Sequence, residues 1–169
     1  MKDASSALVA TMDEGAIARG ARTDGPDVSL AGAPPLPVPA GPQVSGWSAT
    51  ILVSREAPHV YTECADIWNP IHTERRIALA AGLPDIILQG SATMAIAARE
   101  LVNRVASGDP SRLARLAGQF RAMVVPGEEF RVVCDGVGPD EAGGKVALFE
   151  VLNVRGEPAV KYGAASFRG

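Results

Sequence analysis

Apolar residues recur with the period of an α-helix between residues 91 and 105. They lie three or four positions apart, with charged or polar residues between them; the apolar set is Met94, Ala97, Ala98, Leu101, Val102 and Val105. This spacing predicts one amphipathic helix that begins near Ser91 and buries one face. Gly108 and Pro110 follow it, and such residues end a helix.

A shorter helix is predicted ahead of this one. Thr73 is a suitable N-cap residue, the next residues are compatible with a helix, and Gly82 and Pro84 end the segment. Further upstream, His59 follows Pro58 in a region that we interpret as a connection between a strand and a loop.

Strand-like segments surround the two helices. Residues 48–54 are apolar and β-branched, and Gly- or Pro-containing turns separate the later segments at 116–125, 129–137, 145–154 and 158–167. Within 129–137, apolar Phe130, Val132 and Cys134 alternate with other residues, as expected for a half-buried strand. One strand, two helices and an antiparallel meander predict a single α+β domain over residues 47–169.

The first 46 residues differ from the rest in composition. Residues 33–43 contain five prolines, which fix φ and remove backbone donors, so this stretch is predicted to be an extended linker. Ahead of it, 7–11 and 16–20 flank a Met-Asp-Glu-Gly segment that could close a short hairpin. We therefore expect a hairpin remnant and a linker at 1–46, followed by the domain at 47–169.

Composition narrows the range of partners. The net charge of −3 and the pI of about 5.4 give no basic surface for nucleic acid or anionic lipid. The chain has neither an apolar run of about 18 residues nor an export signal, which predicts a cytoplasmic protein that does not span a membrane. Cys64 and Cys134 are isolated, and the two histidines, His59 and His72, form no ligand cluster, so we expect free thiols, no metal and no cofactor.

The most specific signal is a pair of short motifs. Asn69-Pro70-Ile71-His72 is followed by Gln89-Gly90, where the long helix is predicted to begin. This pair resembles the active-site signature of the MaoC-like (R)-specific enoyl-thioester hydratases, in which an acidic residue, one spacer, Asn-Pro, an aliphatic residue and His precede a His-Gly pair. The segment Phe120–Glu128 and the residues Asn153 and Gly156 are also similar to that family.

The resemblance implies a hot-dog fold, in which an antiparallel sheet wraps around the long helix. It also implies that His72 acts as a base on water and that the Gly90 N–H faces the thioester oxygen. Asn69, together with the proline after it, would shape the turn that presents His72, because a residue before proline is held out of the α region. The implied substrate is an acyl-CoA or an acyl-carrier-protein thioester, and the implied assembly is a homodimer or a heteromer with another hot-dog subunit.

Two positions depart from the family pattern. The family acid should stand two residues before Asn69, where this chain has Ile67, while Asp66 lies one position early. Either the backbone turns Asp66 into the site, or the acid has been lost. Gln89 replaces the histidine of His-Gly and keeps hydrogen-bonding capacity without titrating near neutrality.

Aromatic residues near the motif are further candidates. Trp68 is interpreted either as a core anchor or as a pocket wall, and Tyr61 stands at the start of the motif segment. We include both residues with Asn69, Gln89 and Gly90 as candidates for substrate contact.

The function predicted on this basis is that of a hydratase or dehydratase for a 2-enoyl or 3-hydroxyacyl thioester. One alternative is a repurposed hot-dog enzyme that uses His72 for cyclisation or isomerisation in secondary metabolism. Another is a non-catalytic acyl-binding subunit of a heteromeric hydratase. Fold class alone does not separate these alternatives.

Overall fold

A computed structural model of the chain describes residues 1–16, 20, 22, 24–26 and 34–169. These residues form two units, Met1–Pro35 and Leu36–Gly169. Within the first unit, Lys2 and Leu8 form an isolated antiparallel bridge. The hairpin expected at 7–20 stays a prediction, because residues 17–19 lie outside the described residues.

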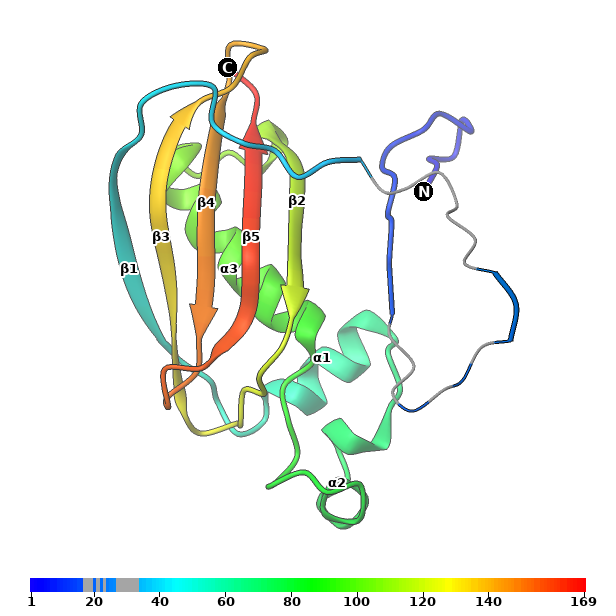
Figure 1. Ribbon diagram of the computed structural model, residues 1–169. Coiled ribbons are helices and arrows are strands. Elements are labelled where there is room, and N and C mark those ends of the chain that lie inside the picture. Colours follow the sequence, from blue (N-terminus) through cyan, green and yellow to red (C-terminus); the bar gives the residue numbers. More distant parts are fainter. Residues whose placement is uncertain (17–19, 21, 23, 27–33) are drawn as a thin grey trace. The chain divides into compact units, whose positions relative to one another are not determined.

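The larger unit is built on five antiparallel strands (Figure 1). They are β1 (Val44–Leu52), β2 (Leu113–Phe120), β3 (Glu129–Pro139), β4 (Lys145–Leu152) and β5 (Pro158–Phe167). Their order across the sheet is β1-β3-β4-β5-β2, so β1 and β2 form its two edges. The predicted α+β class and the antiparallel sheet are confirmed.

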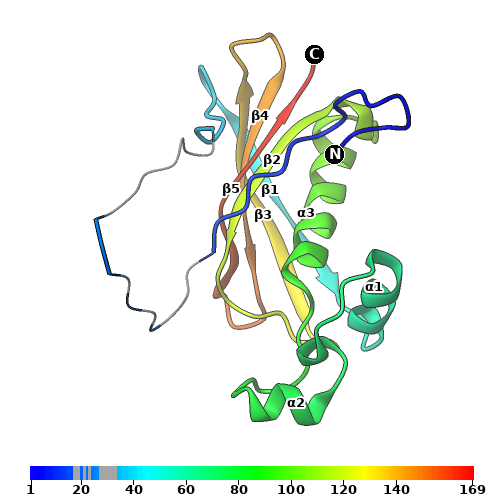
Figure 2. The ribbon, with the colours of Figure 1, turned by 90° about the vertical axis from the view of Figure 1, so that its right-hand side faces the viewer.

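The long helix α3 (Gly90–Val105) lies along one face of this sheet (Figures 1 and 2). Its residues Ala97 and Leu101 are completely buried, and the sheet contributes Phe130, Phe149 and Phe167, each about 1% exposed. Burial of each large apolar side chain stabilises the fold by about 1.5–3 kcal/mol. The helical period that was read from residues 91–105 therefore predicted the element around which the core forms.

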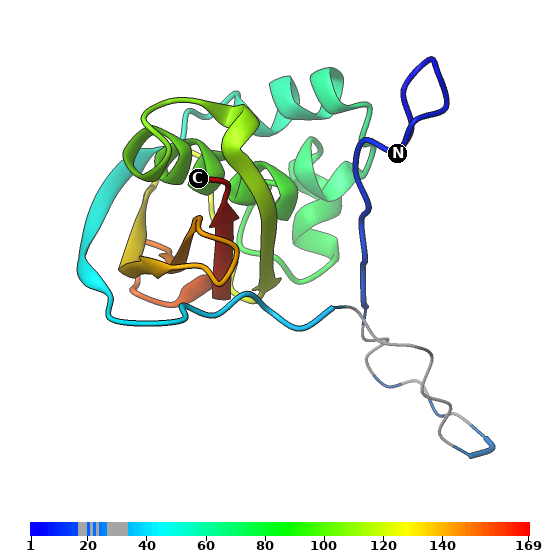
Figure 3. The ribbon, with the colours of Figure 1, turned by 90° about the horizontal axis from the view of Figure 1, so that it is seen from above.

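The opposite face of the sheet is crossed by residues 36–43 (Figure 3). The Ala40 N–H donates to the Pro139 carbonyl at 2.8 Å, and Leu36 and Val38 help to line a small cavity of about 240 Å³ against β4 and β5. This part of the predicted linker thus packs on the domain.

Two predicted strand limits were wrong by four residues or more. β1 begins at Val44, four residues before the predicted start, because its first residues pair with the end of β3 up to Val137. β2 ends at Phe120, five residues before the predicted end. Arg121 and Ala122 still donate to the Ala159 and Pro158 carbonyls, and after them the chain leaves the edge of the sheet, where the Val124 carbonyl accepts from the Leu88 N–H at 2.8 Å.

Helix α1 (Ala57–Ala65) was not predicted, and His59 lies inside it instead of in a strand-to-loop connection. Its valine, tyrosine and threonine are weak helix formers, so the local signal is poor. The N-cap assigned to Thr73 was also wrong. Glu74 is the N-cap of α2 (Arg75–Ala80), while Thr73 ends the preceding 3₁₀ helix η1 (Pro70–His72), its N–H bonded to the Pro70 carbonyl.

Candidate active site

The Asn-Pro motif builds the turn that carries His72. Asn69 is extended, with φ −147° and ψ 118°, as expected for a residue before proline. Its side-chain oxygen accepts from the Ile71 N–H at 3.3 Å, and its carbonyl accepts from the His72 N–H at 3.0 Å. Asn69 therefore caps η1 and fixes the direction in which the histidine leaves it.

The ring of His72 is anchored at one nitrogen. Nδ1 lies 2.8 Å from the carbonyl oxygen of Ile87, and the side chain is half-buried. A carbonyl oxygen can only accept, so in this pair Nδ1 carries the hydrogen. In the neutral ring, Nε2 then keeps a lone pair that can take a proton.

Gly90 is the first residue of α3, as the motif predicted. Its N–H belongs to the four at a helix N-terminus that have no partner within the helix, and the helix dipole favours negative charge there. Ile87, which holds the His72 ring, stands three residues before Gly90. One short segment therefore connects the candidate base to the candidate oxyanion donor.

Gln89 is 2% exposed and bridges α3 to α1. Its Nε2 donates to the Pro58 carbonyl at 2.9 Å and to the Thr62 hydroxyl at 2.8 Å. Both amide hydrogens are therefore engaged within the protein. Among the described residues its Oε1 has no hydrogen-bond partner, although it is buried.

Asp66 lies at the end of α1 in the left-handed region, with φ 53°. Its N–H and the Ile67 N–H both bond to the Thr62 carbonyl, and its side chain is exposed. Ile67, at the family's acid position, is 40% exposed. Trp68 is 68% exposed, which excludes the interpretation as a core anchor.

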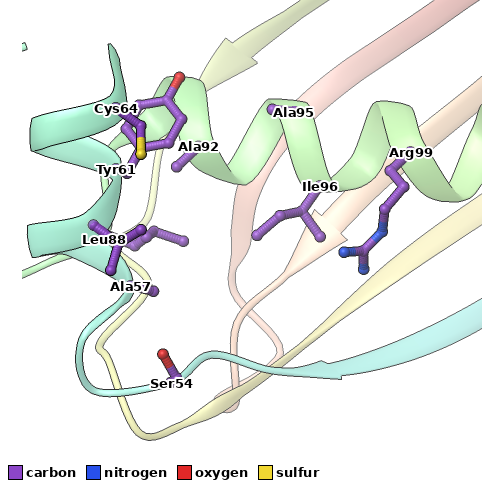
Figure 4. Close-up of a pocket in the computed structure, with 10 residues that line it drawn as sticks. Ser54, Ala57, Tyr61, Cys64, Leu88, Ala92, Ala95, Ile96 and Arg99 are labelled. Carbon is purple, nitrogen blue, oxygen red and sulfur yellow. The ribbon is translucent and has the colours of Figure 1, made fainter. Parts of the chain in front are cut away.

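Tyr61 lines an apolar groove of about 430 Å³ between α1 and α3 (Figure 4). Cys64 lies beside it on α1, and Arg99 lies toward the other end of the groove on α3. His59, on the same helix, has Nε2 3.1 Å from the Thr73 carbonyl and so faces η1. At 100° per residue, Tyr61 and His59 point to well-separated sides of α1, so the groove and η1 lie on different sides of this helix.

Sequence reasoning did not identify Phe120 as a site residue, although it noted the segment that Phe120 begins. The ring lies directly against Gly90: three of its carbons are 3.0–3.2 Å from where a Cβ on Gly90 would lie. The residue is 56% exposed. A sequence pattern cannot show this contact, because it joins residues from a strand end and a helix start.

Two further properties concern the described part of the chain. No group of three or more His, Cys, Asp or Glu residues there could hold a metal ion. Among those same residues, none of the helices combines the length and apolarity needed to span a bilayer.

Comparison with known proteins settles the family. The family model described as MaoC like domain matches residues 48–155. The chain belongs to the MaoC-like family. It carries a MaoC-like domain over residues 48–155, and the resemblance inferred from the Asn-Pro-Ile-His and Gly90 motifs is confirmed.

Solved structures agree on the fold. A MaoC-like dehydratase from Phytophthora capsici aligns with 80% of this chain and 44% of its own, at 23% identity and a TM-score of 0.66. The (R)-hydratase from A. caviae aligns with 76% of this chain and 97% of its own, at 15% identity and a TM-score of 0.65. At such identities the likeness shows the fold alone, and it confirms the hot-dog architecture.

Curated relatives are similar over shorter stretches. The fatty acid synthase beta subunit pigK of Monascus ruber is 36% identical over 104 residues, which is 62% of this chain and 5% of that protein. The peroxisomal enoyl-CoA hydratase 2 of Arabidopsis thaliana is 36% identical over 61 residues, 36% of this chain and 20% of that protein. The chain therefore spans only a small part of these relatives.

Proposed function

We propose that this domain is a hydratase or dehydratase acting on 2-enoyl or 3-hydroxyacyl thioesters. The observation that carries the proposal is the anchored ring of His72. With Nδ1 bound to the Ile87 carbonyl, Nε2 is the basic nitrogen, and the anchoring residue Ile87 stands three residues before Gly90. The family membership and the enoyl-CoA hydratase relative support the same reaction class.

In the hydration direction, water adds across the C2=C3 bond. His72 Nε2 takes a proton from water while the oxygen of that water bonds to C3, and the electrons move onto the thioester oxygen. The Gly90 N–H at the start of α3 stabilises this oxyanion, a contribution of about 3 kcal/mol for a single well-placed donor. The protonated His72 then returns the proton to C2, which completes the addition of one water; dehydration is the reverse.

The acid of the family signature has no clear counterpart in this mechanism. Ile67 carries no ionisable group, and Asp66 is an exposed residue at the end of α1. We therefore assign water activation to His72 and treat Asp66 as the candidate acid that mutation must test. Asn69 and Gln89 have no chemical step in this mechanism. Asn69 caps η1, and both amide hydrogens of Gln89 are bonded within the protein.

The two departures at Ile67 and Gln89 also favour a second candidate function. A site that keeps His72 but lacks the family acid could catalyse a different proton transfer, such as isomerisation or cyclisation, or could only bind the acyl group. Several relatives are fatty acid synthase beta subunits, including pkiC of Emericella nidulans. Such relatives are compatible with a role in the synthesis of acyl products.

We propose acyl-CoA or acyl-carrier protein as the carrier and a second hot-dog subunit as the partner. A single sheet leaves β1 and β2 as open edges, and proteins normally pair or cover such edges. The solved ChsH1-ChsH2 complex of Mycobacterium tuberculosis, similar to this chain with a TM-score of 0.61, is one such assembly of two different proteins. A cytoplasmic location stays a prediction from the sequence.

The decisive experiment is the loss of enoyl absorbance from crotonyl-CoA and from longer enoyl thioesters. Wild-type protein should convert them to 3-hydroxyacyl products, and His72→Ala should not. His59→Ala serves as the matched control, because His59 also contacts a backbone carbonyl but lies on α1. Equal activity of His72→Ala and wild type would refute the proposed role of this histidine.

A further inference from the structure

The contact between Phe120 and Gly90 joins an edge of the sheet to the N-terminus of the long helix. Phe120 is the last residue of β2 and is paired with Val160 of β5. Its Cδ1, Cγ and Cε1 lie 3.0, 3.1 and 3.2 Å from the position of a Cβ on Gly90. Such distances are tighter than ordinary van der Waals contact, so the aromatic ring already fills the space that a side chain at position 90 would need.

The exposure of Phe120 sets it apart from the other phenylalanines. The chain has four, and Phe130, Phe149 and Phe167 are each about 1% exposed. Phe120 is 56% exposed, although it stands beside the first turn of α3. Phe120 therefore packs ring atoms on Gly90 and still exposes more than half of its surface to solvent.

We infer that Phe120 is a substrate-contacting residue that forms one wall of the thioester site and that its ring is the reason why residue 90 is glycine. The inference rests on the proposed function, because it takes the Gly90 N–H as the donor to the thioester oxygen. A carbonyl accepting from that N–H lies about 3 Å from the nitrogen. The atoms on either side of the carbonyl then come within reach of a ring that touches Gly90.

The chemistry of the wall indicates which acyl groups it favours. An aromatic face contributes dispersion and apolar burial, and a flat conjugated enoyl thioester can lie parallel to it. A 3-hydroxyacyl group is tetrahedral at C2 and C3 and cannot stack in this way. We therefore expect Phe120 to increase the affinity for the 2-enoyl form more than the affinity for the 3-hydroxyacyl form.

The first test uses stability and needs no activity. Gly90→Ala in the wild-type protein forces a methyl group into the ring of Phe120, so the melting temperature should fall by about 5 °C. In a Phe120→Ala background the three ring carbons nearest to this methyl group are absent. Because alanine is a better helix former than glycine, Gly90→Ala should then leave the melting temperature unchanged or raise it. An equal fall in both backgrounds would overturn the explanation of Gly90.

The second test measures binding and turnover. Phe120→Ala should raise the KM for crotonyl-CoA about tenfold at nearly constant kcat, because the thioester and C2, which lie against the ring, stay flat in both the enoyl ground state and the enolate-like transition state. Calorimetry with crotonyl-CoA in a His72→Ala background, which leaves the thioester unreacted, should show a weaker complex when Phe120→Ala is added, while the complex with saturated butyryl-CoA should weaken less. Leu52→Ala is the control: Leu52 is 67% exposed on the opposite edge strand β1, and its loss should change neither value.

The possible outcomes separate this inference from the proposed function. If wild type hydrates the thioester and Phe120→Ala has an unchanged KM, Phe120 does not contact the substrate, and the hydratase proposal is unaffected. If Phe120→Ala binds the thioester more weakly but wild type does not hydrate it, the contact between Phe120 and the substrate is supported and the proposed hydratase activity is refuted. The absence of any thioester binding by wild type refutes both.

Discussion

The imidazole Nδ1 of His72 lies 2.8 Å from the carbonyl oxygen of Ile87, three residues before the first turn of α3. The bond joins η1 to the segment that enters the long helix. It fixes the ring relative to the Gly90 N–H and directs the unprotonated Nε2 away from the anchor. A base and an oxyanion donor that share one rigid connection need little reorganisation during the reaction.

Replacing His72 with asparagine should separate anchoring from proton transfer. The amide nitrogen of asparagine can take the place of Nδ1 and donate to the Ile87 carbonyl, but the side chain has no basic nitrogen. We expect the melting temperature to change little and kcat to fall about 10³-fold. The assay is enoyl absorbance loss, with thermal unfolding as the check on structure.

The matched control for this substitution is His59→Gln. Glutamine can keep a donor at the position of Nε2, which lies 3.1 Å from the Thr73 carbonyl. Its kcat should stay within about twofold of wild type. Near-normal turnover by His72→Asn would mean that this histidine only holds the turn.

Gln89 should contribute to stability through its two bonds to α1. Gln89→Leu removes the side-chain donor to the buried Pro58 carbonyl and to the Thr62 hydroxyl, and the expected loss in the free energy of unfolding is about 2 kcal/mol. Thr62→Val removes the other acceptor and should cost less. Because the two residues share one bond, the double variant should lose less than the sum of the single losses.

Urea unfolding of the four proteins measures this coupling. Gln89→Glu is the informative companion, because a carboxylate has no N–H to offer to either acceptor and would be buried against a carbonyl. It should be less stable than Gln89→Leu. Strict additivity of the single losses would show that the bond to Thr62 adds nothing to stability.

Much of the fold could be predicted because its strongest signals are periodic. The face that includes Ala97 and Leu101 repeats every three or four residues over a long segment, and in β3 Phe130 and Val132 alternate with less buried neighbours. These elements are specified by burial of one face. Gly90 could also be placed, because a motif and the start of the periodic segment coincide there.

The part of the site that depends on α1 could not be predicted. This helix is nine residues long, begins with Ala-Pro and contains weak helix formers. It is held by tertiary bonds from Gln89 to Pro58 and Thr62, which no local pattern contains. Without this helix, the sequence grouped Tyr61 with His72, although Tyr61 lies in a groove on another side of α1 from η1.

The two cysteines should react very differently with a thiol reagent. Burial raises the pKa of the Cys134 thiol, and its Sγ lies 3.6 Å from the Gly136 carbonyl oxygen. Cys64 is exposed in the groove. Because its thiol is accessible to solvent, Cys64 should be labelled quickly in the folded protein.

A raised pKa means that Cys134 holds less thiolate at every pH below that value. Since only the thiolate reacts, this buried thiol should stay unlabelled near neutral pH until urea unfolds the chain. The folded Cys64→Ser variant is the control, and it should contain no rapidly reacting thiol. Two equally fast thiols in the native protein would contradict the burial of Cys134.

The acid position is tested most directly by two separate substitutions, one at Asp66 and one at Ile67. Asp66 is an exposed residue with φ 53°, a conformation that asparagine also tolerates, so Asp66→Asn removes the charge without straining the turn. If Asp66 shared a water molecule with His72, this substitution would reduce kcat as much as the loss of His72 does, because the two groups would act as a unit. We expect kcat to stay within about threefold, since the Asp66 carboxylate is exposed to water.

Ile67→Asp restores the family acid at its own position. Ile67 is 40% exposed, so an aspartate there would lose little buried apolar area and the fold should persist. A second group holding the water could raise kcat for crotonyl-CoA about tenfold or more over wild type. The increase must disappear in the Ile67→Asp, His72→Asn double variant, because an added carboxylate can act only together with the base. A large loss in Asp66→Asn, with no gain in Ile67→Asp, would instead identify Asp66 as the catalytic acid and make the site an ordinary hydratase site with a displaced carboxylate.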